Sequence, residues 1–268
     1  MRVLIFGDVF GRPGRRALCA QMVDLRTHYQ ADFVVVNAEN AAGGVGLTRT
    51  IADELFGAGA DCLTLGNHCW DQAEMRRHIE REDRIIRPVN LPVGEPGKGV
   101  KDFQVGAVRI SVIQAMGTVF MQPGLSNPFT AVDALLADGR TIGDGQITLV
   151  DFHGEATSEK IALAHHLDGR VSSVTGTHTH IPTADTRIFP GGTAYQTDLG
   201  MCGDYHSVIG SQAEGVMPYY LGERPNMRFT VAMGEPTLCG ILLEIDEATG
   251  QTQLADPIRV GGVLRQAR

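Results

Sequence analysis

The chain has 268 residues, which is long enough to bury a sizeable hydrophobic core in one domain spanning residues 1–268. Hydrophobic residues make up 43% and charged residues 20%, a composition typical of globular proteins, and no apolar stretch is long enough to cross a bilayer. A net charge of −8 without a basic stripe argues against a long nucleic acid as partner, although a small phosphate substrate is compatible with it.

The first third of the chain alternates short apolar runs with helical patterns. Three strands are predicted, over residues 3–6, 33–36 and 62–65. A helix is predicted after the first strand, with apolar residues at helical spacing at Leu18, Met22, Leu25 and Tyr29. Thr48 is predicted to cap a second helix that ends near Gly59, and Asp71 and Glu74 have the spacing of a capping box for a third. This order predicts a parallel sheet covered by helices.

The rest of the chain is predicted to be richer in strands. Extended segments are expected over residues 85–91, 103–105, 108–114, 147–152, 171–175, 186–189, 194–197, 228–233, 238–245 and 252–260. Helices are expected over residues 127–137 and 158–167. We therefore predict an α/β fold in which two mixed β-sheets pack face to face with helices outside, an α-β-β-α sandwich.

Five apolar runs each end at side chains that can bind a metal ion. These are Asp8, Glu39 with Asn40, Asn67 with His68, His153, and His178 with His180. Taken singly, each also has a simpler explanation as a turn, cap, loop or core residue, and the pair His178 and His180 is the strongest of the series. Because ligands in open α/β sheets bind beyond the carboxyl ends of the strands, we expect the whole series at one edge of one sheet. His178 and His180, two apart on an extended segment, should point to the same side.

This set of side chains suits two ions better than one. Two carboxylates, amide oxygens and three histidines exceed what one tetrahedral ion needs. With two divalent ions and a bridging hydroxide, the charges of Asp8 and Glu39 leave a net charge of about +1, which attracts an anionic phosphate. Two ions roughly 3.5–4 Å apart can generate hydroxide and clamp an in-line displacement. We therefore predict metal-assisted hydrolysis of a phosphoester, with ligand types that accept iron, manganese or zinc.

The motifs occur in a fixed order along nearly the whole chain: GDVFGRPGR, NAEN, GNH, FHGE, GTHTH and TDLGMCG. This series resembles the calcineurin-like metallophosphoesterase superfamily and, within it, the bacterial YmdB-type 2′,3′-cyclic-nucleotide phosphodiesterases. Phe10 stands where the broad superfamily has a histidine, and Glu39 where it has a bridging aspartate. The narrower family looks the same as this chain at both positions.

The resemblance implies a role for each residue. One ion would be held by Asp8, Asn40 and His180, the other by Asn67, His153 and His178, with Glu39 bridging the two. His68 would bind no metal and would lie beside the phosphate as general acid or charge stabiliser. The implied ions are iron or manganese. The implied reaction opens the 2′ ester of a 2′,3′-cyclic nucleotide and leaves a 3′-nucleotide.

Two other functions stay open on the sequence alone. A metal-dependent amidase or peptidase would use the same ions, and a regulatory protein that senses a nucleotide or a metal would keep the site with weak hydrolysis. Five cysteines, without a C-x-x-C pair, favour reduced thiols in a cytoplasmic protein. A small phosphodiester is the expected partner, with no membrane association and with a homo-oligomer compatible with the sequence.

Overall fold

The computed structural model describes residues 1–267, in which two β-sheets pack face to face. Within these residues the first sheet has eight strands: β1 (Arg2–Phe6), β2 (Asp8–Val9), β3 (Phe33–Asn37), β4 (Cys62–Thr64), β5 (Ile85–Ile86), β12 (Met201–Asp204), β13 (Pro236–Ile245) and β14 (Thr252–Val260). The second has six: β6 (Val100–Val105), β7 (Val108–Met116), β8 (Gln146–His153), β9 (Ser173–Thr177), β10 (Arg187–Ile188) and β11 (Ala194–Gln196).

Both sheets are mixed, as predicted. The first runs in the order β2-β12-β13-β1-β3-β4-β5, with β14 paired to β13, and the second runs β10-β11-β9-β8-β7-β6. Strands β1, β3, β4 and β5 are mutually parallel, and so are β7, β8, β9 and β11. In the first sheet β2 and β12 also pair in parallel, and β13 is antiparallel to β12, β1 and β14. In the second sheet β10 and β6 are antiparallel to their neighbours.

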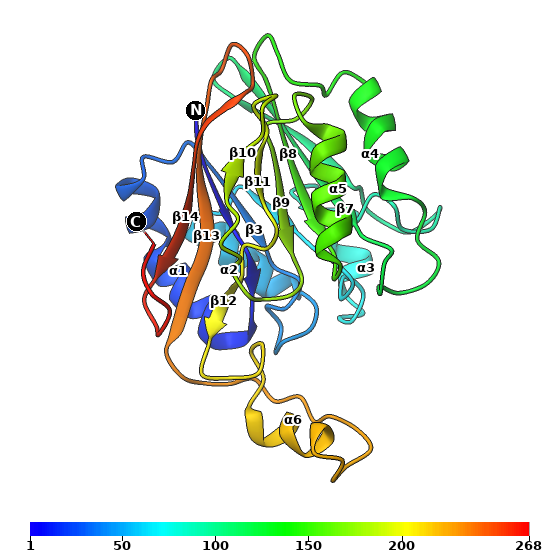
Figure 1. The fold of residues 1–268 in the computed structure, drawn as a ribbon, viewed down its shortest axis with the longest axis vertical. Coiled ribbons are helices and arrows are strands. Elements are labelled where there is room, and N and C mark those ends of the chain that lie inside the picture. Colours follow the sequence, from blue (N-terminus) through cyan, green and yellow to red (C-terminus); the bar gives the residue numbers. More distant parts are fainter. Residues whose placement is uncertain (268) are drawn as a thin grey trace.

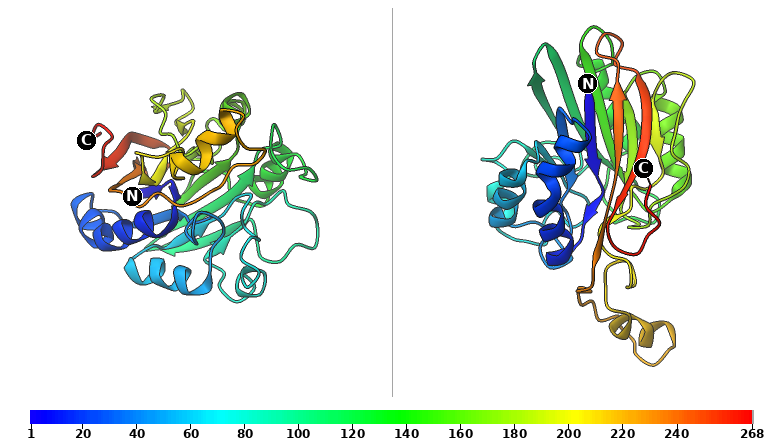
Figure 2. Two further views of the ribbon diagram at one scale, coloured as in Figure 1. Left: turned by 90° about the horizontal axis from the view of Figure 1, so that it is seen from below. Right: turned by 90° about the vertical axis from the view of Figure 1, so that its left-hand side faces the viewer.

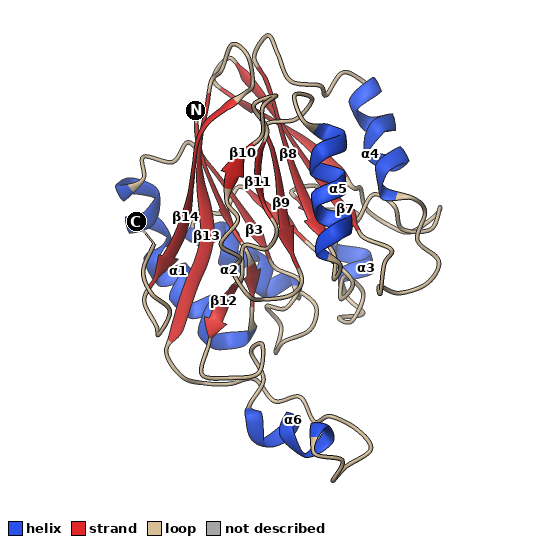
Figure 3. Cartoon of the chain, viewed as in Figure 1, coloured by secondary structure: helices blue, strands red, loops and turns tan. Residues whose placement is uncertain are grey.

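Helices cover the two outer faces, which gives the predicted α-β-β-α order of layers (Figure 2, right; Figure 3). The first sheet is covered by α1 (Gly11–His28), α2 (Arg49–Ala58) and the short α3 (Met75–His78). The second sheet is covered by α4 (Pro128–Ala137) and α5 (Thr157–Leu167). Among the described residues, no helix combines the length and the apolar character needed to span a bilayer.

The alternation of side chains along each strand divides the core into layers. On β1, Leu4 packs against the helices that cover the first sheet, while Ile5 points between the two sheets. On β8, Leu149 points between the sheets and Val150 toward α4 and α5. Strand β8 is therefore buried on both faces, which explains its continuous apolar run.

Toward the carboxyl ends of the parallel strands, the layer between the sheets changes from apolar to polar. On β8 the inward-facing series continues from Leu149 to Asp151 and His153. Asp151 accepts hydrogen bonds from Thr64 Oγ1 at 2.5 Å, Thr177 Oγ1 at 2.8 Å and Asn37 Nδ2 at 3.1 Å. This buried polar layer joins β3, β4, β8 and β9 directly beneath the strand ends that carry the predicted site.

The two ends of α2 were predicted correctly, whereas the start of α3 was not. The Thr48 hydroxyl accepts from the Ile51 N–H at the start of α2, and Gly59 ends that helix in the left-handed conformation. Asp71 does not cap a helix: α3 begins only at Met75, with Glu74 as its N-cap residue and no side-chain cap. The prediction of a third helix starting at the Asp71 capping box was therefore wrong.

Residues 205–235 were predicted least well. Residues 228–233, expected to form a strand, instead lie in a loop with a single bridge at Val231. The preceding β12 and the helix α6 (Ala213–Tyr220) were not predicted. The segment projects from the body as an arm between β12 and β13 (Figure 1). Residues 228–233 bond only to the short segment 210–215, at the bridge between Val231 and Ser211 and beside it, and this contact is too short to make a strand.

Candidate metal centre

The predicted site residues gather at the carboxyl ends of parallel strands, but from two sheets instead of one. Asp8 follows β1, Glu39 and Asn40 follow β3, and Asn67 and His68 follow β4, all in the first sheet. His153 is the last residue of β8, and His178 and His180 follow β9, in the second sheet. The expectation of one edge of one sheet was wrong. The site lies where the edges of the two packed sheets meet.

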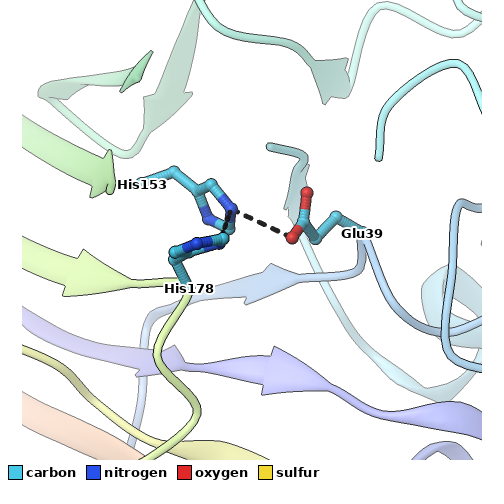
Figure 4. Close-up of side chains that lie close together, drawn as sticks. All are labelled: Glu39, His153 and His178. Atoms are coloured by element: carbon cyan, nitrogen blue, oxygen red, sulfur yellow. Dashed lines mark hydrogen bonds and ion pairs between the residues drawn. The ribbon is translucent and has the colours of Figure 1, made fainter. Parts of the chain in front are cut away.

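Glu39, His153 and His178 converge on a single point (Figure 4). His153 Nε2 lies 3.0 Å from Glu39 Oε1, 2.9 Å from Asn67 Oδ1 and 3.1 Å from His178 Nδ1. Donor atoms that share an ion at about 2.1 Å lie roughly 3 Å from one another. The four side chains therefore have the spacing of a ligand set, and they are the group proposed for one ion together with its bridging carboxylate.

The ring nitrogens that do not face this cluster are already occupied. The Thr177 hydroxyl donates to Asp151, so at 2.9 Å it accepts from the Nδ1–H of His153. His180 Nδ1–H donates to the Ile209 carbonyl at 2.8 Å, and His178 Nε2 lies 3.3 Å from Glu155. These contacts leave Nε2 of His153 and His180 and Nδ1 of His178 with a free lone pair, as a metal ligand requires.

Three buried oxygens of the proposed ligands have no hydrogen-bond donor. Within residues 1–267, Asp8 Oδ1, Glu39 Oε1 and Asn40 Oδ1 are all inaccessible and unpaired. The amide nitrogen of Asn40 donates to the Gly44 carbonyl at 2.9 Å, which fixes the oxygen as its free atom. Buried polar atoms are normally satisfied, and a buried carboxylate needs a cation or several donors. The donor set of oxygens and imidazoles therefore fits bound metal.

Phe10 lies beside His180, one of the candidate ligands. Its ring packs edge-on against His180, with 5.2 Å between ring centroids. Gly210, at the start of the arm, packs directly against the Phe10 ring, because any side chain at this position would collide with it. Phe10 thus supports the ring of His180 instead of offering a ligand of its own.

Burial and neighbouring charges shape the protonation of the cluster. Burial raises the pKa of Asp8, against the opposing effect of His180 and His153. Burial also opposes the ionised form of Glu39, yet His153 outweighs it and lowers the pKa of Glu39. Burial and the adjacent His153 lower the pKa of His178. These shifts favour the ionised carboxylate of Glu39 and the neutral imidazole of His178, the forms that bind metal ions. At His153, Glu39 and Asp8 outweigh burial and raise the pKa to about 9, so a bound metal ion would displace a proton from this ring.

Gly66 allows these groups to approach one another. A side chain at this position would collide with Glu39 Oε2 and with the ring of His153. Gly66 directly precedes Asn67 in the turn after β4, so the turn can pass beneath the cluster only without a Cβ atom. The glycine of the GNH motif is therefore a packing requirement of the site.

His68 stands apart from the cluster and faces solvent. Its side chain is 32% exposed, and its Nδ1 lies 2.8 Å from Asp71 Oδ2. Its backbone N–H donates to Glu39 Oε2 at 3.0 Å, which ties the residue to the centre through its main chain. Sequence reasoning treated Asp71 only as a helix cap and missed this contact. The three-residue spacing from His68 was the available signal.

Asp151 and Thr177 were also missed as supporting residues. A carboxylate inside the apolar run ITLVDFHG was the signal, because a buried charge needs partners. Asp151 binds the Thr177 hydroxyl, and that hydroxyl accepts the Nδ1–H of His153. These two hydrogen bonds fix the tautomer and orientation of His153, as partners of metal-binding histidines usually do.

Replacing Thr177 by valine tests the hydrogen bonds from Asp151 through Thr177 to His153, because the two side chains have nearly the same volume. Thr177→Val removes the acceptor for His153, and we expect metal affinity to fall about 10- to 100-fold. Thr177→Ser keeps the hydroxyl and should stay near the wild-type affinity. Titration of Mn²⁺ against a competing chelator measures both variants, and equal affinities for the two would contradict the role given to the hydroxyl.

Comparisons with known proteins identify the family of this chain. A family model described as YmdB-like protein matches residues 4–258. The chain belongs to the YmdB-like family. This confirms the family resemblance of the motifs. The 2′,3′-cyclic-nucleotide 2′-phosphodiesterase of Bacillus subtilis (strain 168) is 44% identical over 251 residues, which cover 93% of each chain.

Solved structures of similar proteins share the fold over nearly the whole length. The crystal structure of a novel phosphatase from Mycoplasma pneumoniae is 35% identical, with a TM-score of 0.91 over 97% of this chain and 93% of that one. A crystal structure of a hypothetical protein from Thermus thermophilus is 42% identical, with a TM-score of 0.90 over 98% and 100% of the two chains. Membership of the YmdB-like family therefore extends from the motifs to the complete α-β-β-α architecture.

Proposed function

We propose that this protein hydrolyses 2′,3′-cyclic nucleotides to 3′-nucleotides at a centre of two metal ions. The observation that carries the proposal is the convergence of four side chains: donor atoms of Glu39, Asn67 and His178 lie 3.0, 2.9 and 3.1 Å from His153 Nε2. Among the described residues, buried oxygens of Asp8 and Asn40 also lack a hydrogen-bond donor. The activity named for the Bacillus subtilis relative, at 44% identity, supports the choice of substrate.

The candidate ligands form two groups, one for each proposed ion. Asn67, His153 and His178 would hold one ion and Asp8, Asn40 and His180 the other, with the Glu39 carboxylate between them. Iron or manganese suits these ligands, and zinc is also compatible with them. The bound ions would supply a nucleophile from water at neutral pH and offset the charge of the phosphate.

His68 would handle the proton of the leaving group. Asp71 is bound to Nδ1, so Nε2 of His68 is free to face the substrate. The 2′ oxygen leaves as an alkoxide unless it receives a proton, and an imidazolium Nε2–H at this position can donate one. Asp71 orients the ring, in the way that a carboxylate orients a catalytic histidine.

Elemental analysis of anaerobically purified protein, paired with product analysis, tests the proposal. We expect about two bound metal ions per chain, as in a two-metal site. We also expect 2′,3′-cyclic AMP to be converted to 3′-AMP, with little turnover of 3′,5′-cyclic AMP. A peptide panel serves as the control for amidase activity. Protein without bound metal, or 2′-AMP as the product, would contradict the proposal.

A further inference from the structure

A fully buried ion pair lies behind the histidine segment of the site. Lys160 of α5 and Asp198, which follows β11, have side chains that are 0% exposed, and Lys160 Nζ lies 2.9 Å from Asp198 Oδ2. Burying two charges costs several kcal/mol per ion unless further hydrogen bonds compensate. The partners that supply these hydrogen bonds indicate what the pair does.

Both members of the pair bind the backbone on either side of His178. Lys160 Nζ donates to the Thr177 carbonyl at 2.8 Å, just before His178. Asp198 Oδ2 accepts from the Thr179 N–H at 3.0 Å, just after it. The other oxygen of Asp198 accepts from the Gly200 N–H at 2.8 Å. One ion pair thus fixes the two peptide groups that determine the direction of the His178 side chain.

The segment that the pair holds is strained. His178 has φ 100° and His180 has φ 66°, both in the left-handed region. Such conformations are unfavourable for non-glycine residues and persist only where surrounding contacts enforce them. At the far end, the His180 carbonyl accepts from the Met201 N–H at 3.1 Å and from the Tyr205 hydroxyl at 3.0 Å. The segment is therefore held from both ends.

The anchor is itself fixed and tightly packed. The Asp198 N–H donates to Thr183 Oγ1 at 3.0 Å, and the Thr183 N–H donates back to the Asp198 carbonyl at 3.0 Å. A side chain at Gly176, on β9, would collide with the Thr197 carbonyl and contact the stem of Lys160. The strand that delivers His178 therefore lies directly against the segment that carries Asp198.

We propose that Lys160 and Asp198 are positioning residues that hold residues 178–180 in the conformation, left-handed at His178 and His180, in which these two histidines face the metal centre. The inference rests on the proposed function, because it takes these two histidines as ligands. Lys160 also offsets the charge of Asp198, which would otherwise add to the negative charge of Asp8 and Glu39 at the centre.

Charge and positioning make opposite predictions for one variant. Lys160→Met leaves a net negative charge near the centre, so electrostatics alone would strengthen the binding of a cation. Positioning predicts the reverse, because the Thr177 carbonyl loses its donor. Asp198→Asn lowers affinity under either account. The double variant leaves the net charge unchanged, so a loss of affinity there reports positioning alone.

The test is Mn²⁺ affinity, measured by competition with a chelator, together with the number of ions bound. We expect Lys160→Met and Asp198→Asn each to weaken binding about 10- to 100-fold. The double variant should bind more weakly than wild type but more tightly than Lys160→Met, because no unpaired charge is left and the introduced amide oxygen still accepts the Thr179 N–H. The control is Leu163→Ala, which removes a fully buried side chain from the same helix.

Leu163→Ala should lower the melting temperature while keeping wild-type Mn²⁺ affinity. Unchanged or tighter binding by Lys160→Met would overturn the inference, and so would equal weakening by Leu163→Ala. If Lys160→Met fails to fold, wild-type affinity of the double variant overturns it instead. Wild-type protein that takes up no Mn²⁺ would contradict the proposed function itself, which separates the two failures.

Discussion

Glu39→Gln should lose the metal centre while keeping the fold. One carboxylate oxygen accepts the His68 N–H, and the other lies 3.0 Å from His153 Nε2 in the middle of the cluster. An amide keeps an oxygen for the His68 N–H but presents an NH₂ group to the cluster, and that group cannot bind a metal. Because the lost ligand is also the proposed bridge and carries a charge, we expect affinity for Mn²⁺ to fall at least about 100-fold.

Metal-induced stabilisation separates this loss from a loss of folding. A ligand that binds only the folded state raises its stability, so wild-type protein should gain melting temperature when Mn²⁺ is added. Glu39→Gln should gain little at the same concentration, with unchanged circular dichroism. Glu80→Gln, at an exposed glutamate, is the matched control and should respond like wild type. A Glu39→Gln variant with full metal content would rule out the bridging role.

The family and the positions of the candidate ligands could be predicted because they depend on local features of the sequence. A short apolar run that ends in a carboxylate, amide or imidazole marks both a buried strand and its carboxyl end. Glu39 after β3 and His153 at the end of β8 were found in this way. Which strands share a sheet depends on pairing between distant segments. The apolar runs therefore could not show that the strand ends of the site belong to two sheets.

The partners of the supporting residues could not be predicted because they lie far away in sequence. Lys160 meets Asp198 across 38 positions, and Asn37 meets Asp151 across 114. In the sequence, Lys160 lies in a helical pattern and Asp198 in a turn-like segment, and neither shows its burial. Asp71 misled for the opposite reason: a local capping pattern offered a sufficient explanation, while its side chain contacts His68.

His68→Ala should keep the bound metal and lose most of the turnover. The imidazole of His68 pairs with Asp71, and the hydrogen bond from His68 to Glu39 comes from its backbone N–H, which alanine retains. General acid catalysis contributes typically 10²–10⁴-fold, so we expect kcat for 2′,3′-cyclic AMP to fall by about that factor. His165→Ala, at an exposed histidine of α5, should leave both metal content and turnover unchanged.

The leaving group decides whether His68 acts as an acid or only as a charge. The 2′ alkoxide of a nucleoside needs a proton, whereas p-nitrophenolate is stable without one. His68→Ala should therefore slow hydrolysis of bis-p-nitrophenyl phosphate far less than hydrolysis of 2′,3′-cyclic AMP, and Asp71→Asn should show the same bias with smaller losses. Equal losses on both substrates would instead favour charge stabilisation of the phosphate, since that contribution does not depend on which oxygen leaves.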